Sequence, residues 1–105
     1  MVSKMKKIGI IGHGADKFTI DSMQAAMAII ENIFEEADIT LVSGHSPVGG
    51  IDIWAEETAR SFGIPCDIKT PKQHKWDSAY GYKQRNIDIA KDSDELHVIL
   101  VDISF

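Results

Sequence analysis

Short apolar runs alternate along this chain with longer amphipathic segments, and this alternation limits the fold more than any other feature of the sequence. The apolar runs predict strands at residues 6–11, 39–42, 65–68 and 95–103. The amphipathic segments predict helices at residues 20–37, 52–62 and 79–91. Strands that alternate with helices form right-handed crossovers and a parallel sheet. We therefore predict a single Rossmann-like α/β domain over residues 1–105, with about four parallel strands and helices on both faces of the sheet.

Individual residues indicate where some of these elements begin and end. Thr19 or Asp16 is expected to cap the first helix, and Gly63 is expected to end the second helix. Pro65 places the third strand near an edge of the sheet. Cys66 on that strand is the only cysteine. A lone cysteine excludes an internal disulfide and a cysteine-based zinc site, so we expect its thiol in the core.

The composition and net charge limit the cellular compartment of the protein and the kinds of partner that it can bind. The formal net charge is −5, which argues against broad nucleic-acid binding because that needs a cationic surface. No apolar run approaches the roughly 20 residues that cross a bilayer. The apolar run behind the basic N-terminus covers only residues 8–11, which is too short for the core of a signal peptide. We therefore expect a cytoplasmic protein with no membrane contact.

A glycine-rich loop between the second strand and the second helix is the strongest candidate for a binding site. It contains Ser43, Gly44, Gly49 and Gly50, and Asp52 follows at the predicted start of the helix. Glycines let a ligand approach the backbone closely. A helix start directs N–H groups and positive partial charge toward an anion. The pattern predicts a phosphate or ribose site, but it is not a P-loop, because no Gly-Lys-Ser/Thr sequence follows.

Two roles are open for Asp52. Its carboxylate can cap the free N–H groups at the start of the helix, or it can accept hydrogen bonds from ribose hydroxyls. In a hydrolase, it is the candidate catalytic residue near C1′ of the ribose. For Gly50 we expect that a bulky substitution abolishes binding and leaves the fold intact.

Further candidates come from loops that the fold brings to the same edge of the sheet. In open α/β sheets, ligands bind beyond the carboxyl ends of the strands, near the point where the strand order reverses. The first strand ends there with Gly12 and His13, and the loop before the third helix supplies Trp76 and Tyr80. Trp76 can stack on a base or cover the edge of the core.

The third helix contributes the pair Arg85-Asn86. Arg85 can hold a phosphate through two hydrogen bonds, or it can pair with an acid such as Asp88 on its own helix. Residues 69–85 are rich in bases, which could steer a small anion to this edge or remain solvated. The histidines show no metal-binding spacing, so no metal site and no cofactor are expected.

Several separated motifs together resemble one superfamily. They are S-G-x-x-P-x-G-G-x-D at residues 43–52, G-I-P at residues 63–65, Trp76, and R-N at residues 85–86. This order resembles the SLOG superfamily, the Rossmann-like proteins related to the DNA-processing protein DprA and to the LOG phosphoribohydrolases. Within it, the pattern is most similar to small stand-alone YspA-like members. The resemblance covers nearly the whole chain.

The resemblance implies binding of nucleotides or nucleotide-derived ligands, such as ADP-ribose-like molecules, at the glycine loop and at the Arg85-Asn86 pair. Two departures stand out. Small relatives end the first strand with G-S-R, and here His13 replaces the basic contact. The phosphoribohydrolases carry P-G-G-x-G-T-x-x-E, whereas here the third glycine and the threonine are missing, and we assign neither Glu56 nor Glu57 to the place of the glutamate.

Three functional hypotheses follow. The first is a module that binds a nucleotide-derived small molecule, as a sensor or an accessory protein. The second is an N-glycosidic hydrolase of the phosphoribohydrolase kind, which acts on nucleoside monophosphates. The third is a non-catalytic interaction subunit whose ligand site has decayed. A homodimer fits the resemblance, because relatives often pair through helices.

Overall fold

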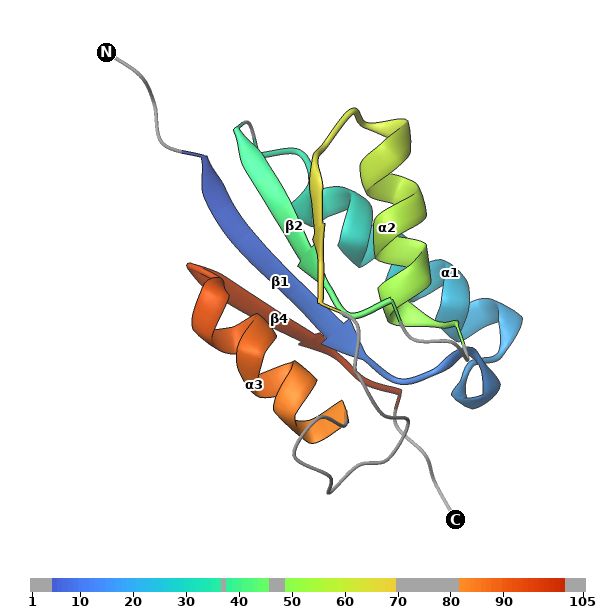
Figure 1. Cartoon of the computed structure of the whole chain (residues 1–105). Coiled ribbons are helices and arrows are strands. Elements are labelled where there is room, and N and C mark those ends of the chain that lie inside the picture. Colours follow the sequence, from blue (N-terminus) through green and yellow to red (C-terminus); the bar gives the residue numbers. More distant parts are fainter. Residues whose placement is uncertain (1–4, 37, 46–48, 70–81, 102–105) are drawn as a thin grey trace.

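Four parallel strands form one sheet, as the sequence predicts, and the structure adds their order, which is β3–β2–β1–β4 (Figure 1). The structure is a computed structural model that describes residues 5–36, 38–45, 49–69 and 82–101. The strands are β1 (Lys6–Gly12), β2 (Ile39–Ser43), β3 (Cys66–Ile68) and β4 (Glu95–Ile99). The helices are α1 (Ile20–Ile33), α2 (Ile51–Ser61) and α3 (Tyr82–Asp92), with a short 3₁₀ turn, η1 (Ala15–Lys17), before α1. β3 lies at the edge of the sheet, which confirms the inference from Pro65.

The helices cover both faces of the sheet (Figure 1). Ile8 and Ile10 of β1 point toward α1 and α2 and lie in the main core cluster. The alternate residue Gly9 faces α3, where an added Cβ would lie 3.0 Å from Cγ2 of the buried Ile89. Because Gly9 has no side chain, α3 packs close to β1 on this face of the sheet. Alternate residues of β1 therefore face α1 and α2 on one side of the sheet and α3 on the other.

Local capping residues set two of the helix boundaries as predicted. Thr19 and Ser22 form a reciprocal capping box at the start of α1: the Ser22 N–H donates to Thr19 Oγ1 over 3.1 Å, and the Thr19 N–H donates to Ser22 Oγ over 2.8 Å. At the end of α2, Gly63 has φ 72°. The Ile64 N–H donates to the Ala59 carbonyl over 2.8 Å, which completes a Schellman motif.

The first helix ends earlier than predicted, at Ile33 rather than at residue 37. Phe34 is its C-cap, and the acids Glu35 and Glu36 follow. Negative side chains at the carboxyl end of a helix oppose its dipole, which works against a further turn. Asp38 then adopts φ 58° and leads the chain into β2. The predicted start of the third helix at residue 79 lies outside the described residues, in which α3 starts at Tyr82. The last strand ends at Ile99 and does not include Leu100 or Val101, so the prediction that it extends to residue 103 is wrong.

Asp92 at the end of α3 joins three elements through ion pairs. Its Oδ1 lies 3.0 Å from Lys7 Nζ, and its Oδ2 lies 3.1 Å from Nζ of Lys69, which follows β3. Hydrogen bonds from Lys7, which has the largest effect, and from Lys69 lower the pKa of Asp92 from 3.8 to about 2. In the unfolded chain the carboxylate binds its proton more tightly, so these bonds stabilise the fold above about pH 4 and lose their effect as the pH falls toward about 2.

We therefore expect Asp92→Asn to flatten the decline in stability between about pH 4 and pH 2. Urea midpoints measured across pH 2–7 test this expectation. The matched control is Asp88→Asn, because Asp88 is exposed on the same helix and bonds only to Gln84 among the described residues. If the two variants give the same pH profile as the unmodified protein, Asp92 does not contribute in this way.

Cys66 on β3 is half-buried and packs against the core cluster, so the expectation of a core thiol is only partly met. Burial raises the pKa of its thiol, and the charge of Glu56 adds to this effect. Over the described ranges, none of the helices has both the length and the apolar character needed to span a bilayer.

Candidate functional site

The order of the strands creates a crevice between β1 and β4. From β1 through β3 the chain advances along the sheet with α1 and α2 on one face, and then α3 crosses the other face to place β4 on the far side of β1. The order of the strands thus reverses between β1 and β4. At such a switch point the loops after neighbouring strands diverge, and ligands bind beyond the carboxyl ends of those strands.

A cavity of about 230 Å³ lies at this switch point. Its polar residues are Gly12, His13, Asp52, Arg85 and Asn86, all of which the sequence analysis proposed as site residues. Its apolar residues are Ile11, Val98 and Leu100. The structure therefore brings residues from β1, α2, α3 and β4 to one place, and the apolar wall from β4 is an addition that sequence reasoning missed.

Asp52 and Arg85 form a buried ion pair in this cavity. Asp52 Oδ2 lies 3.5 Å from Arg85 Nη1, and the two side chains are 5% and 8% exposed. The same Nη1 donates to the Gly44 carbonyl over 2.8 Å, and Nε donates to Asn86 Oδ1 over 2.9 Å. Arg85 is therefore anchored by the protein itself, and it partners Asp52 from α2 rather than Asp88 on its own helix.

Gly44 has a packing role next to this ion pair. A Cβ built at Gly44 would lie 2.5 Å from Arg85 Cζ and still closer to Nη1. Because Arg85 is buried, its guanidinium cannot easily move aside. The glycine that the sequence analysis assigned to a ligand therefore makes room for the arginine of the same site.

His13 connects three elements around the cavity. Its Nδ1 accepts the N–H of Val101 over 3.0 Å, and its backbone N–H donates to the Ile99 carbonyl over 3.4 Å. Its own carbonyl accepts the Ile51 N–H at the start of α2, over 3.2 Å. Because Nδ1 accepts this hydrogen bond, the N–H that His13 can offer to a ligand is the one on Nε2.

The start of α2 differs from the prediction in one respect. The N-cap is Gly50, and the helix begins at Ile51, so the N-cap position does not belong to Asp52. Gly50 has φ 87° and ψ −144°, a conformation that essentially only glycine adopts. A Cβ there would lie 2.5 Å from the His13 carbonyl oxygen and 2.6 Å from Ala15 N. The expectation that a bulky residue at position 50 leaves the fold intact is therefore wrong.

Ser43 and Glu56 form a second buried polar group behind the loop. Ser43 is fully buried, and its Oγ donates to Glu56 Oε2 over 3.1 Å. Glu56 is 1% exposed, and its Oε1 lies 2.8 Å from His45 Nδ1. Ser43 thus bonds to the protein itself, and Glu56 is a buried carboxylate one helical turn beyond Asp52.

Sequence reasoning missed Glu56, although two observations could have found it. It follows Asp52 by four residues, so both face the same side of α2. It is also the sixth residue after Gly50. The same interval separates the second glycine from the glutamate in P-G-G-x-G-T-x-x-E, so the spacing does place Glu56 at the position of that glutamate.

Some of the proposed residues are not part of the cavity wall. Gly49 has φ 76° and is half-buried, and within the described residues neither it nor Gly50 lines the cavity. Trp76 and Tyr80 lie outside the described residues. In the part of the chain that the structure describes, no group of three His, Cys, Asp or Glu side chains is placed to hold a metal ion.

Fold and site together define a Rossmann-like α/β domain with a lined cavity at its topological switch point. No protein-family model and no curated protein sequence matches the chain. Among solved structures, the chain is similar to DNA processing protein A (DprA) from Streptococcus pneumoniae, with 15% sequence identity and a TM-score of 0.47. The match covers 91% of this chain and 31% of that one, so this chain spans about a third of the length of the protein it matches.

Proposed function

We propose that this domain binds a nucleotide-derived small molecule, of the ADP-ribose or nucleoside-monophosphate class, in the cavity between β1 and β4. The observation that carries the proposal is the composition of the cavity wall, which combines a buried carboxylate, an N–H donor and an apolar surface at the switch point. Ligand pockets are typically apolar with a few fixed polar groups. The volume of about 230 Å³ is below the roughly 300–1,000 Å³ of a typical ligand pocket, so the cavity would hold one part of such a ligand.

Each wall residue has a specific role in this proposal. The carboxylate of Asp52 accepts hydrogen bonds from ribose hydroxyls, and Arg85, itself anchored on the Gly44 carbonyl, holds it in position. His13 donates from Nε2, and the base packs against Val98 and Leu100. Because Arg85 neutralises Asp52, these walls carry no net negative charge that would repel a phosphate. The phosphate would then lie toward the start of α2, where the helix dipole favours an anion.

The test uses a wall residue whose substitution does not disturb the ion pair. Val98 is 53% exposed, and Val98→Asp places a negative charge beside the ligand. Because the base packs against this position, binding would have to bury the new carboxylate without a partner, which weakens binding by about tenfold or more. Leu96→Asp is the matched control, since Leu96 lies two residues earlier on β4 and does not line the cavity.

The measurement is a thermal-shift panel with AMP, ADP-ribose, NAD and cyclic nucleotides, followed by calorimetry on any hit. We expect one nucleotide class to raise the melting temperature, because a ligand that binds only the native state stabilises it. Val98→Asp should weaken that ligand while Leu96→Asp does not. A flat panel at millimolar ligand overturns the proposal and favours the interaction subunit. If both variants weaken binding of the nucleotide equally, the ligand does not bind in this cavity.

A second candidate function rests on the two buried carboxylates of α2. Asp52 and Glu56 are 4% and 1% exposed on successive turns, and an N-glycosidic hydrolase needs a carboxylate near C1′ of the ribose. The assay is release of free base and ribose 5-phosphate from nucleoside monophosphates, compared among the unmodified protein, Asp52→Asn and Glu56→Gln. Turnover that survives both substitutions excludes these residues from catalysis, and binding without turnover leaves the first proposal in place.

A further inference from the structure

β4 forms one edge of the sheet, and β3 forms the other (Figure 1). β3 is only three residues long, follows Pro65 and contains the charged Asp67, and Lys69 comes directly after it. Short length, proline and charge are the usual means by which proteins prevent an edge strand from pairing with another chain. β4 has five residues and no proline, and its acid, Glu95, lies at its start and pairs with Lys6. The edge at β4 therefore lacks the protection that the edge at β3 has.

The backbone of β4 directs hydrogen-bonding groups away from the sheet. Within the described residues, β4 pairs with β1 alone. The Ile99 carbonyl accepts the His13 N–H, so Ile99 faces β1. Successive residues of a strand direct their N–H and C=O groups to opposite sides, so Leu96 and Val98 direct theirs outward. Such a row of N–H and C=O groups along an edge is a template for another strand.

The side chains of the same residues form an apolar row on the α3 face of β4. Leu96 lies beside Gly9, where an added Cβ would be 3.0 Å from its Cδ1, and Val98 and Leu100 follow at alternate positions. All three are exposed, from 40% at Leu96 to 62% at Leu100. An apolar row of this kind on an edge strand indicates a surface for protein contact.

The other face of β4 borders an uncharged groove beside α1. The groove has a volume of about 180 Å³, and its walls include Ser22, Ala25 and Ile29 of α1 and Leu100 after β4. None of the described residues that line it is charged. Ala25 and Ile29 are both exposed. The edge strand thus has apolar surface beside it on both faces of the sheet.

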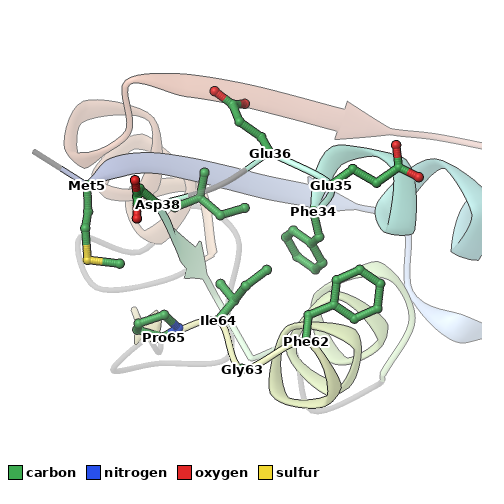
Figure 2. Close-up of a pocket in the computed structure, with 10 residues that line it drawn as sticks. Met5, Phe34, Glu35, Glu36, Asp38, Phe62, Gly63, Ile64 and Pro65 are labelled. Atoms are coloured by element: carbon green, nitrogen blue, oxygen red, sulfur yellow. The ribbon is translucent and has the colours of Figure 1, made fainter. Parts of the chain in front are cut away.

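The net charge of the chain, −5, limits where two copies can meet. Figure 2 shows a different apolar hollow, where the rings of Phe34 and Phe62 lie at the ends of α1 and α2. Glu35 and Asp38 also line that hollow, so two copies joined there would bring acids close together. Along β4 the acid is Glu95, whose charge an ion pair balances. A second copy therefore meets less repulsion at β4 than at the hollow.

We propose that β4 pairs antiparallel with β4 of a second copy, which joins the two sheets into one. A two-fold axis near Val98 places Leu96 opposite Leu100 of the second copy, and such apolar cross-strand pairs stabilise the joint. The same pairing keeps the two Glu95 side chains roughly 20 Å apart along the strands. This contact runs through a strand, unlike the pairing through helices that the family resemblance implies. It does not depend on the proposed nucleotide site.

Sedimentation equilibrium of the full chain, from micromolar to millimolar concentration, tests the proposal. We expect a monomer–dimer equilibrium that Leu96→Asp weakens by at least about tenfold, because the joint would bury a carboxylate without a partner. Ile29→Asp on α1 should weaken it as well, and this variant decides the test if Leu96→Asp impairs folding. The matched control is Ile68→Asp, since Ile68 is 39% exposed, as Leu96 is 40% exposed, but lies on the opposite edge.

Amide hydrogen exchange then identifies the surface that pairs. The amides of Leu96 and Val98 should exchange at least about tenfold more slowly in the dimer, because carbonyls of the second strand accept their hydrogen bonds. The Ile68 amide is the internal control. The Lys69 N–H donates to the Ser43 carbonyl, so Ile68 directs its own amide outward from the other edge. Its exchange should not change with protein concentration.

Several outcomes overturn this proposal. A chain that stays monomeric at millimolar concentration excludes the second copy. If the amides of Leu96 and Val98 are protected in that monomer, another part of the same chain covers the edge. If Ile68→Asp weakens the dimer as much as Leu96→Asp does, the effect comes from net charge rather than from β4. A dimer that is lost in Phe62→Asp and kept in Leu96→Asp would form through the hollow in Figure 2 instead.

Discussion

Replacing Gly50 with alanine is expected to lower the free energy of unfolding by about 2–6 kcal/mol. Holding a non-glycine residue at φ 87° and ψ −144° costs about 1–3 kcal/mol. The new Cβ also lies 2.5–2.6 Å from backbone atoms of His13, Gly14 and Ala15. Backbone cannot move aside as a flexible side chain can, and overpacking of this kind costs about a further 1–3 kcal/mol.

Gly63→Ala is the matched control for this prediction. Gly63 also has a positive φ, 72°, but a Cβ there would meet no atom within 4 Å. We expect a loss of only about 1–2 kcal/mol, from the left-handed conformation alone. Urea unfolding of both variants measures the difference. Equal losses would mean that Gly50 does not pack against the β1–η1 turn as the structure describes.

Breaking the Asp52–Arg85 pair is the second change with a large expected effect. Both side chains are at least nine-tenths buried, and removal of one partner from a buried ion pair costs about 3–5 kcal/mol. Asp52→Asn keeps the size of the side chain and removes its charge. We therefore expect it to destabilise the protein by about 3 kcal/mol, measured as a shift of the urea midpoint.

A double-mutant cycle shows whether this loss comes from the pair. In an Arg85→Met background, Asp52→Asn should cost much less, because the buried arginine that it would leave unbalanced is already gone. Glu57→Gln provides the control for loss of an exposed acid on the same helix, with an expected effect within about 0.5 kcal/mol. Additive losses in the cycle would argue against coupling between Asp52 and Arg85.

Features that depend on local sequence were predictable. The alternation of apolar runs and amphipathic segments predicts the four parallel strands and the helices between them. Thr19 and Gly63 mark helix ends through capping and through positive φ, which neighbouring residues determine. The early end of α1 was missed because the apolar period continues past Ile33, whereas the acids behind it oppose another turn.

Features that depend on contacts between distant elements were not predictable. Arg85 bonds to the carbonyl of Gly44, which lies 41 residues earlier, and no periodicity predicts such a contact. The sequence identified both residues as site candidates and assigned both to a ligand, yet each contacts the other. Val98 and Leu100 escaped notice because an apolar strand residue looks the same in sequence whether it faces a core or a cavity.

The position of Arg85 along the chain also affects how the protein matures during synthesis. Asp52 is made early, within α2, but its partner belongs to α3, and β1 receives its second neighbour only when β4 follows. Until Arg85 has left the ribosome, the ion pair with Asp52 cannot form. The sheet then has β1 as an exposed edge. The Asp52–Arg85 pair, the second neighbour of β1 and the wall of the cavity can therefore form only after α3 and β4 have been made.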